Sequence, residues 1–85
     1  MRAIIFRPKA EKHYNEGEKY DTKVADKIDD LIDDILQTPF EGLGKPEALK
    51  HNLKGFWSRR ITKEHRLVYQ VTKDKIIIIS CKFHY

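Results

Sequence analysis

Cationic side chains, a carboxylate and a terminal histidine give this chain the residue types for chemistry on an anionic polymer. From Lys45 to Arg66, 22 residues contain seven Lys or Arg, two His, two aromatic residues and only two carboxylates. The chain ends on Phe83-His84-Tyr85, which places a titratable ring at the last-but-one residue. A cationic strand pair with one carboxylate at its entrance suits a polyanion better than a neutral small molecule.

Metal-free cleavage of RNA requires a base for the 2′-hydroxyl proton, cations for the developing charge on phosphate, and an acid for the departing 5′-oxygen. Glu47 can act as the base and His84 as the acid. Arg66, supported by Arg60 and Lys50, can form the cationic clamp. Taken singly, each residue has a simpler interpretation. Glu47 can be a surface carboxylate, Arg66 a partner in a cross-sheet ion pair, and His84 a terminal residue with no function. Because clustered charges also occur in purely structural settings, the pattern alone leaves both interpretations open.

The connection between two predicted strands decides where the arginines lie. With a three-residue connection at Lys63–His65, Arg60 lies opposite Arg66 and both project from the same face. A two-residue connection instead pairs Ile61 with Arg66, which mixes an apolar and a charged side chain on one face. We favour the first arrangement. Two adjacent guanidinium groups repel each other unless an anion lies between them, and their forked donors suit a phosphate.

Two helices are expected ahead of this region. The β-rich run Ala3–Phe6 stops at Pro8, and a first helix is predicted over Lys9–Tyr20. Asp21 or Thr22 caps a second helix, which ends before Pro39. Its apolar residues recur at the spacing of one buried face: Val24, Ala25, Ile28, Leu31, Ile32, Ile35 and Leu36. The other side carries Asp26, Asp29, Asp30, Asp33 and Asp34, which we interpret as solubilising charges or as a contact for a basic partner segment.

The second half of the chain is expected to form the sheet. After a Gly- and Pro-rich loop at Thr38–Glu47, the predicted strands are Leu49–Leu53, Phe56–Thr62, Arg66–Val71 and Lys75–Tyr85. The unbroken run Ile76–Ile79 indicates a central strand covered on both faces. The predicted fold class is therefore α+β, a single domain over residues 1–85. Its order is β-α-α followed by three or four strands, in an antiparallel-rich sheet with both helices on one face.

The charges divide unequally along the chain. Residues 1–41 carry seven Lys or Arg against ten Asp or Glu, and residues 42–85 carry ten against three. The net charges are therefore −3 and +7, which predicts a polyanionic partner for the second half. A single cysteine, Cys81, cannot form an internal disulfide, and no apolar run reaches membrane-spanning length. We therefore expect a cytoplasmic protein. The four histidines show no zinc-ligand spacing, so no metal or other cofactor is expected.

Several segments resemble the YoeB-type toxins, a branch of the RelE superfamily. The segments that carry the resemblance are Thr38–Gly42, Gly44–Glu47, Leu49–Leu53, Gly55–Ile61, Glu64–Tyr69 and Cys81–Tyr85. The resemblance covers residues 38–85 densely, whereas residues 1–20 depart from the family pattern. It implies a microbial-ribonuclease-like α+β fold and a toxin that cleaves mRNA in the ribosomal A site.

The resemblance also implies partners and roles for single residues. It implies neutralisation by a partly disordered, acidic, YefM-like antitoxin and a tendency to form homodimers. The general base of the family carries over to Glu47, its transition-state arginine to Arg66 and its general acid to His84, while Lys50, Arg60 and Tyr85 match supporting positions. The alternative is a non-catalytic toxin or binding module on the same scaffold, similar to the ParE-type gyrase inhibitors. The presence of all three catalytic residue types favours the ribonuclease.

Overall fold

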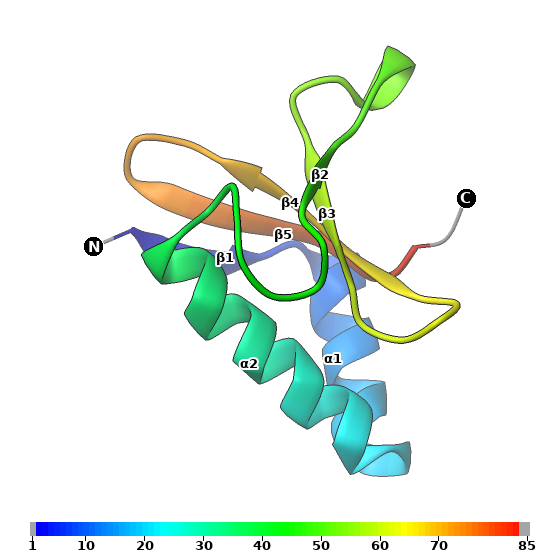
Figure 1. Ribbon diagram of the computed structural model, residues 1–85. Helices are drawn as coiled ribbons and strands as arrows, with labels where there is room; N and C mark the ends of the chain where they lie inside the picture. The colour runs from blue at the N-terminus through cyan, green and yellow to red at the C-terminus, as the bar shows by residue number, and fades with distance from the viewer. Residues whose placement is uncertain (1, 84–85) are drawn as a thin grey trace.

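The computed structural model, which describes residues 2–83, places two helices against one face of a five-stranded sheet (Figure 1). The elements are β1 (Ala3–Phe6), α1 (Pro8–Tyr20), α2 (Thr22–Gln37), β2 (Glu47–Ala48), the 3-10 helix η1 (His51–Leu53), β3 (Trp57–Arg60), β4 (Arg66–Val71) and β5 (Lys75–Phe83). The strand order is β1-β5-β4-β3-β2, and only the β1–β5 pair is parallel. The predicted α+β fold class and the antiparallel-rich sheet are confirmed.

Both helices begin where the sequence signals predict. Pro8 opens α1, where its missing N–H costs no hydrogen bond. The side chain of Asp21 caps α2 by accepting a hydrogen bond from the amide of Val24 at 3.3 Å. The predicted apolar side of α2 faces the sheet, with Ile28 and Leu31 fully buried. In the part of the chain that the structure describes, no helix is both long and apolar enough to cross a membrane.

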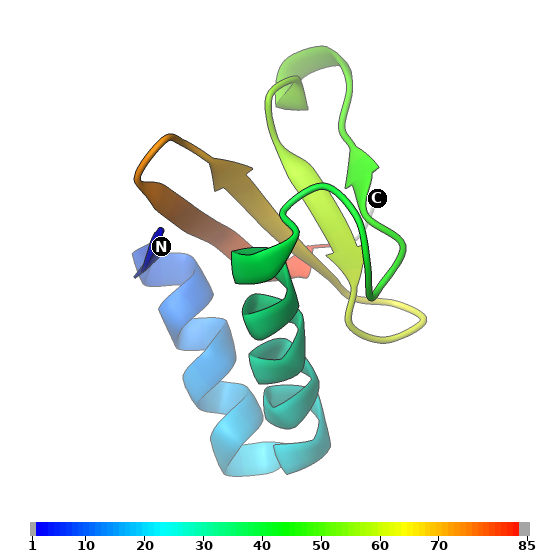
Figure 2. The ribbon, with the colours of Figure 1, turned by 60° about the vertical axis from the view of Figure 1, so that its left-hand side comes forward.

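The isoleucine run in β5 is covered on one face only. Ile76 and Ile78 are fully buried against the helices, but Ile77 and Ile79 on the opposite side remain partly exposed. The prediction that this strand is covered on both faces is therefore wrong, because both helices lie on the same side of the sheet (Figures 1 and 2). The prediction of an inner position is confirmed, since β5 lies between β1 and β4.

The hairpin of β3 and β4 has the predicted register. Arg60 pairs directly with Arg66, so the two side chains share one face of the sheet. The connection is longer than predicted, because β3 ends at Arg60 and five residues, Ile61–His65, precede β4. Within it the amides of Ile61 and Thr62 both donate to the carbonyl oxygen of His65, at 3.0 and 3.2 Å. These bonds close the turn tightly enough to hold the two arginines opposite each other.

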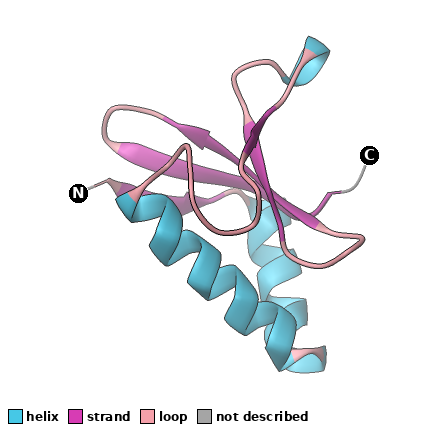
Figure 3. Ribbon diagram, in the orientation of Figure 1, coloured by secondary structure: helices cyan, strands magenta, loops and turns pink. Residues whose placement is uncertain are grey.

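The predicted strand at Leu49–Leu53 is wrong. The strand in this region is β2, only two residues long, and the chain then turns through η1, the short helical segment at the top of Figure 3. The amide of Leu49 still donates to the carbonyl of Phe56 at 2.9 Å, but His51 takes a left-handed φ of 58°. The chain must reverse between β2 and β3, so the residues after Leu49 form the reversal and do not extend the sheet.

Candidate active site

Two of the predicted catalytic residues meet on one face of the sheet. Glu47 on β2 lies opposite Ser58 on β3, and Arg66 begins β4 on the other side of β3. The Nη1 atom of Arg66 lies 3.6 Å from the Oε2 atom of Glu47 and donates to the hydroxyl of Ser58 at 3.4 Å. Strand pairing therefore brings together a carboxylate and a guanidinium that lie far apart in the sequence.

The environments of these two groups differ. The side chain of Glu47 is 59% exposed, while that of Arg66 is 20% exposed and rests on the fully buried Ser58. An ion pair with one exposed partner contributes little to stability, about 0–1 kcal/mol. An incoming phosphate could therefore displace the carboxylate from the guanidinium at little cost and leave Glu47 beside the phosphate.

The predicted supporting cations lie next to this pair. Arg60 is exposed at the end of β3, directly across from Arg66. Lys50 is exposed just before η1, and both Lys50 and Glu47 line a shallow hollow of about 360 Å³ formed by residues 47–53. Glu47 is thus flanked by cations on both sides, Arg66 across the sheet and Lys50 along the chain.

The last two predicted site residues, His84 and Tyr85, lie outside the described residues. The strand that leads to them is described to Phe83, which pairs with Arg66 in the β4–β5 ladder. His84 is bonded directly to this partner of Arg66. Its role as the acid, and the supporting role of Tyr85, remain predictions.

A buried arginine that the sequence analysis did not single out fixes the loop leading to Glu47. Arg59 is 0% exposed and projects from β3 toward α2, on the opposite face from Arg60. Its guanidinium donates to Asp34 Oδ2 at 2.5 Å and to the hydroxyl of Tyr69 at 3.1 Å. It also donates to three backbone carbonyls of the loop, those of Thr38 (2.6 Å), Glu41 (2.8 Å) and Leu43 (3.1 Å).

Asp34 completes this network from the helix side. Its Oδ2 atom also accepts from the amide of Leu43 at 2.9 Å, and these donors, Arg59 first and Leu43 second, lower the pKa of its carboxyl group. Its interpretation as a solubilising charge is therefore wrong. Strict alternation along β3 was the available signal, since it places Arg59 on the helix-facing side, where an unpaired charge would be costly.

A second aspartate of α2 also has a partner within the chain. The hydroxyl of Tyr14 on α1 donates to Asp29 Oδ1 at 2.7 Å, and this bond raises the pKa of Tyr14 to about 12. The acidic side of α2 is therefore used partly to hold the neighbouring helix and the loop that follows.

A histidine on α1 holds the end of β5. The Nδ1 atom of His13 accepts from the amide of Cys81 at 3.1 Å and lies 3.5 Å from the hydroxyl of Ser80. One residue further on, Lys82 pairs with Glu16 at 3.0 Å. Burial, and then the charge of Lys82, lower the pKa of His13, which favours the neutral ring that can accept this hydrogen bond. These contacts fix the strand three residues before His84.

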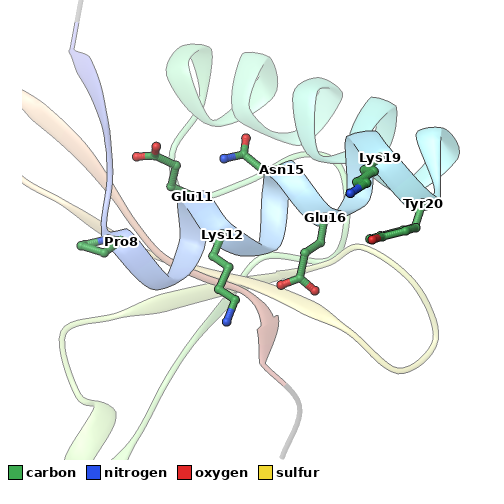
Figure 4. Close-up of a pocket in the computed structure, with 7 residues that line it drawn as sticks. All are labelled: Pro8, Glu11, Lys12, Asn15, Glu16, Lys19 and Tyr20. Atoms are coloured by element: carbon green, nitrogen blue, oxygen red, sulfur yellow. The ribbon is translucent and has the colours of Figure 1, made fainter.

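The hollow along α1 lies apart from the Glu47–Arg66 pair. A hollow of about 510 Å³ follows the outer side of α1 (Figure 4) and is lined by Pro8, Glu11, Lys12, Asn15, Glu16, Lys19 and Tyr20. It contains none of the predicted site residues. Within residues 2–83, no three His, Cys, Asp or Glu side chains lie close enough to hold a metal ion.

Comparison with known proteins gives one consistent result. The sequence model described as the YoeB-like toxin of bacterial type II toxin-antitoxin systems matches residues 6–85. The toxin YoeB of Escherichia coli strain K12 is 63% identical over 65 residues, which is 76% of this chain and 77% of that protein.

Two solved structures are similar over nearly the whole chain. The YoeB dimer from Staphylococcus aureus is 47% identical with a TM-score of 0.94, covering 99% of this chain and 98% of that chain. The toxin in a heterotetrameric YoeB-YefM toxin-antitoxin complex from the same organism is 46% identical with a TM-score of 0.91, covering 100% and 99%.

Proposed function

The chain belongs to the family of YoeB-like toxins of bacterial type II toxin–antitoxin systems, and we propose that it is an endoribonuclease that cleaves mRNA in the ribosomal A site. The observation that carries the proposal is the approach of Arg66 to Glu47, at 3.6 Å, on an exposed face of the sheet. Family membership by itself supports the assignment as a toxin but does not assign the catalytic groups. The contact adds a carboxylate base and a phosphate-binding guanidinium within reach of one substrate group.

The proposed reaction is an in-line displacement at phosphorus. Glu47 takes the proton from the 2′-hydroxyl, and the 2′-oxygen forms a bond to the adjacent phosphorus. The bond from phosphorus to the 5′-oxygen breaks, and His84 donates a proton to that leaving oxygen. The products are a 2′,3′-cyclic phosphate and a 5′-hydroxyl, and the 2′-hydroxyl nucleophile requires no metal.

Arg66 stabilises the charge that builds on the non-bridging oxygens. Its guanidinium donates to the hydroxyl of Ser58 at 3.4 Å and lies 3.6 Å from Glu47, so these contacts position it before the substrate arrives. Arg60, which pairs with Arg66 across the two strands, adds a second guanidinium with forked donors. Lys50 adds a single positive charge in the hollow that it lines together with Glu47. Such donors, fixed before the substrate arrives, act where charge develops and lower the barrier without rearrangement. Tyr85 can stack on the base beside the scissile phosphate.

The partners follow from the same chemistry. The second half of the chain, with a net charge of +7, suits the ribosome and its mRNA, and action on these partners would take place in the cytoplasm. The same charge favours an acidic YefM-like antitoxin, which would inhibit the toxin by covering the site. The similar toxin from Staphylococcus aureus occurs both as a dimer and in complex with YefM, and we propose the same two associations for this chain.

The experiment adds purified protein to a translating extract and maps new mRNA 5′ ends. Wild-type protein should generate ends within translated codons. Glu47→Ala and Arg66→Ala should reduce cleavage by about 10²–10³-fold while the protein stays folded.

Matched controls are Glu18→Ala and Arg7→Ala, which remove the same charges from exposed positions on and next to α1. Wild-type protein that produces no new ends would reject the ribonuclease and favour a non-catalytic, ParE-like toxin. Near-wild-type cleavage by either site variant would reject the role assigned to that residue.

A further inference from the structure

A basic hollow lies next to the proposed site and shares only Arg60 with it. It measures about 520 Å³ and is lined by Lys27, Gly44, Lys45, Arg60, Ile61, Thr62 and Lys63. These residues come from α2, the loop before β2, the end of β3 and the β3–β4 connection. In both Figure 1 and Figure 2, the loop (green) and the connection (yellow) lie together beside α2.

The charge of this hollow has one sign. Its lining includes four cations, Lys27, Lys45, Arg60 and Lys63, and no carboxylate. None of the four forms an ion pair with a carboxylate among residues 2–83. Asp26 and Asp30 flank Lys27 along α2, but neither lines the hollow. Like charges that converge without an acidic partner repel one another, so an anion bound there would relieve an existing cost.

The backbone fixes this arrangement of cations. The carbonyl of Gly44 accepts a hydrogen bond from the amide of Arg60 at 2.7 Å, which ties the loop to the end of β3. Lys45 takes a left-handed φ of 53° immediately before Pro46, a conformation that a lysine side chain disfavours. Strained, over-determined backbone of this kind is concentrated at functional sites.

The hollow is continuous with the proposed catalytic pair. Arg60 belongs to both, because it lines the hollow and also pairs across the sheet with Arg66. Lys45 precedes Glu47 by two residues on the same loop. A chain of phosphates bound at Arg66 can therefore continue over Arg60 into the hollow.

We propose that Lys27, Lys45 and Lys63 form a second phosphate-binding surface, which holds the stretch of the RNA substrate that flanks the scissile phosphate. The surface extends the proposed ribonuclease function, on which it rests, by adding a contact that strengthens binding without touching the reacting atoms. RNA suits it better than an acidic helix, because the lining offers no exposed apolar side chain as an anchor. Ile61, its one large apolar residue, is 7% exposed.

Binding to uncleavable RNA tests this surface. The probes are single-stranded, fully 2′-O-methylated RNAs of two and of twelve nucleotides, which block attack by the 2′-oxygen. The variant is Lys27→Gln, Lys45→Gln and Lys63→Gln combined. The matched control is Lys9→Gln, Lys73→Gln and Lys75→Gln combined, which removes three exposed lysines elsewhere. Thermal melts identify any variant that has lost its fold.

The expected result is a length-dependent loss. Each lost phosphate contact on single-stranded RNA reduces the slope of log affinity against log salt by about 0.7, so the triple variant should lose about 2 units of slope on the twelve-mer. The triple variant should bind the dinucleotide as wild type does. The control variant should bind both probes as wild type does. Equal slopes for the variant and the control on the twelve-mer would overturn the proposal.

Two further measurements separate RNA binding from binding of a protein partner, and failure of this proposal from failure of the proposed ribonuclease function. A triple variant that loses affinity for an acidic peptide but retains it for the twelve-mer would assign the surface to a protein partner and reject the RNA. Cleavage in the translating extract is measured in parallel with wild-type protein. Failure to cleave would reject the ribonuclease, while the twelve-mer slopes would still decide whether this surface binds RNA.

Discussion

Replacing Asp34 with alanine should destabilise the fold far more than any nearby change of the same charge. Asp34 is the only carboxylate paired with Arg59 among the described residues, and the guanidinium of Arg59 is 0% exposed. The substitution leaves the buried cation with its carbonyl and hydroxyl partners but without a counter-charge. The amide of Leu43 also loses its acceptor.

The size of the effect follows from burial. Breaking a buried ion pair by removing one partner costs about 3–5 kcal/mol. The side chain of Asp34 is 27% exposed, so water can partly replace it, and the lower end of that range, about 3 kcal/mol, applies. With a urea dependence of about 1–1.5 kcal/mol per molar for a small domain, the unfolding midpoint should fall by about 2–3 M.

Urea unfolding of wild type, Asp34→Ala and the control Asp33→Ala measures this difference. Asp33 is exposed on the same helix and forms no ion pair among the described residues, so its loss should change stability by less than about 0.5 kcal/mol. Equal midpoints for the two variants would refute the assignment of Asp34 as the counter-charge of Arg59.

The pH dependence provides an independent test of the same pair. The hydrogen bonds from Arg59 and Leu43 lower the pKa of Asp34 in the folded state. Its stabilising contribution is therefore complete above the unfolded-state pKa of about 3.9 and is lost as the pH falls through the folded-state pKa. The stability difference between wild type and Asp34→Ala should narrow below that pH, and a constant difference would contradict the coupling.

Three further predictions concern the loop, the end of β5 and the chain terminus. Gly44→Ala should cost at least about 1 kcal/mol more than Gly55→Ala by urea unfolding, because both have positive φ but only the first would place a Cβ within 3.1 Å of other atoms. Burial lowers the pKa of His13, so its contribution to stability should be complete above about pH 6.5 and fall below it, and His13→Gln should remove that slope in calorimetry. A tag fused after Tyr85 should lower ribosomal cleavage far more than the melting temperature, whereas the same tag at the N-terminus should leave both unchanged.

Much of this fold could be predicted from local patterns. The 3.6-residue periodicity over Val24–Leu36 specified α2 and its buried side, and Asp21 marked its start. The alternation around the β3–β4 connection gave the pairing of Arg60 with Arg66. Both results depend on residues close together in the sequence, where spacing alone determines which side chains share a face.

The remainder depends on contacts between distant segments. Nothing local to Asp34 distinguishes it from its exposed neighbours, because its role arises only when β3 brings Arg59 against the helix. Likewise, the isoleucines of β5 do not reveal that one side of the sheet lacks a covering layer. In the candidate site, the residue types of Glu47 and Arg66 were evident, but their contact required the pairing of β2, β3 and β4.

The most direct test of the central claim uses mRNA with a single 2′-deoxy nucleotide at the position attacked. The mechanism proposed here predicts that cleavage by wild-type protein stops at that position only, because the nucleophile is missing. Unmodified mRNA should give a 2′,3′-cyclic or 3′ phosphate together with a 5′-hydroxyl. Cleavage that continues at the deoxy position would contradict attack by the 2′-hydroxyl and, with it, the assignment of Glu47 as the base.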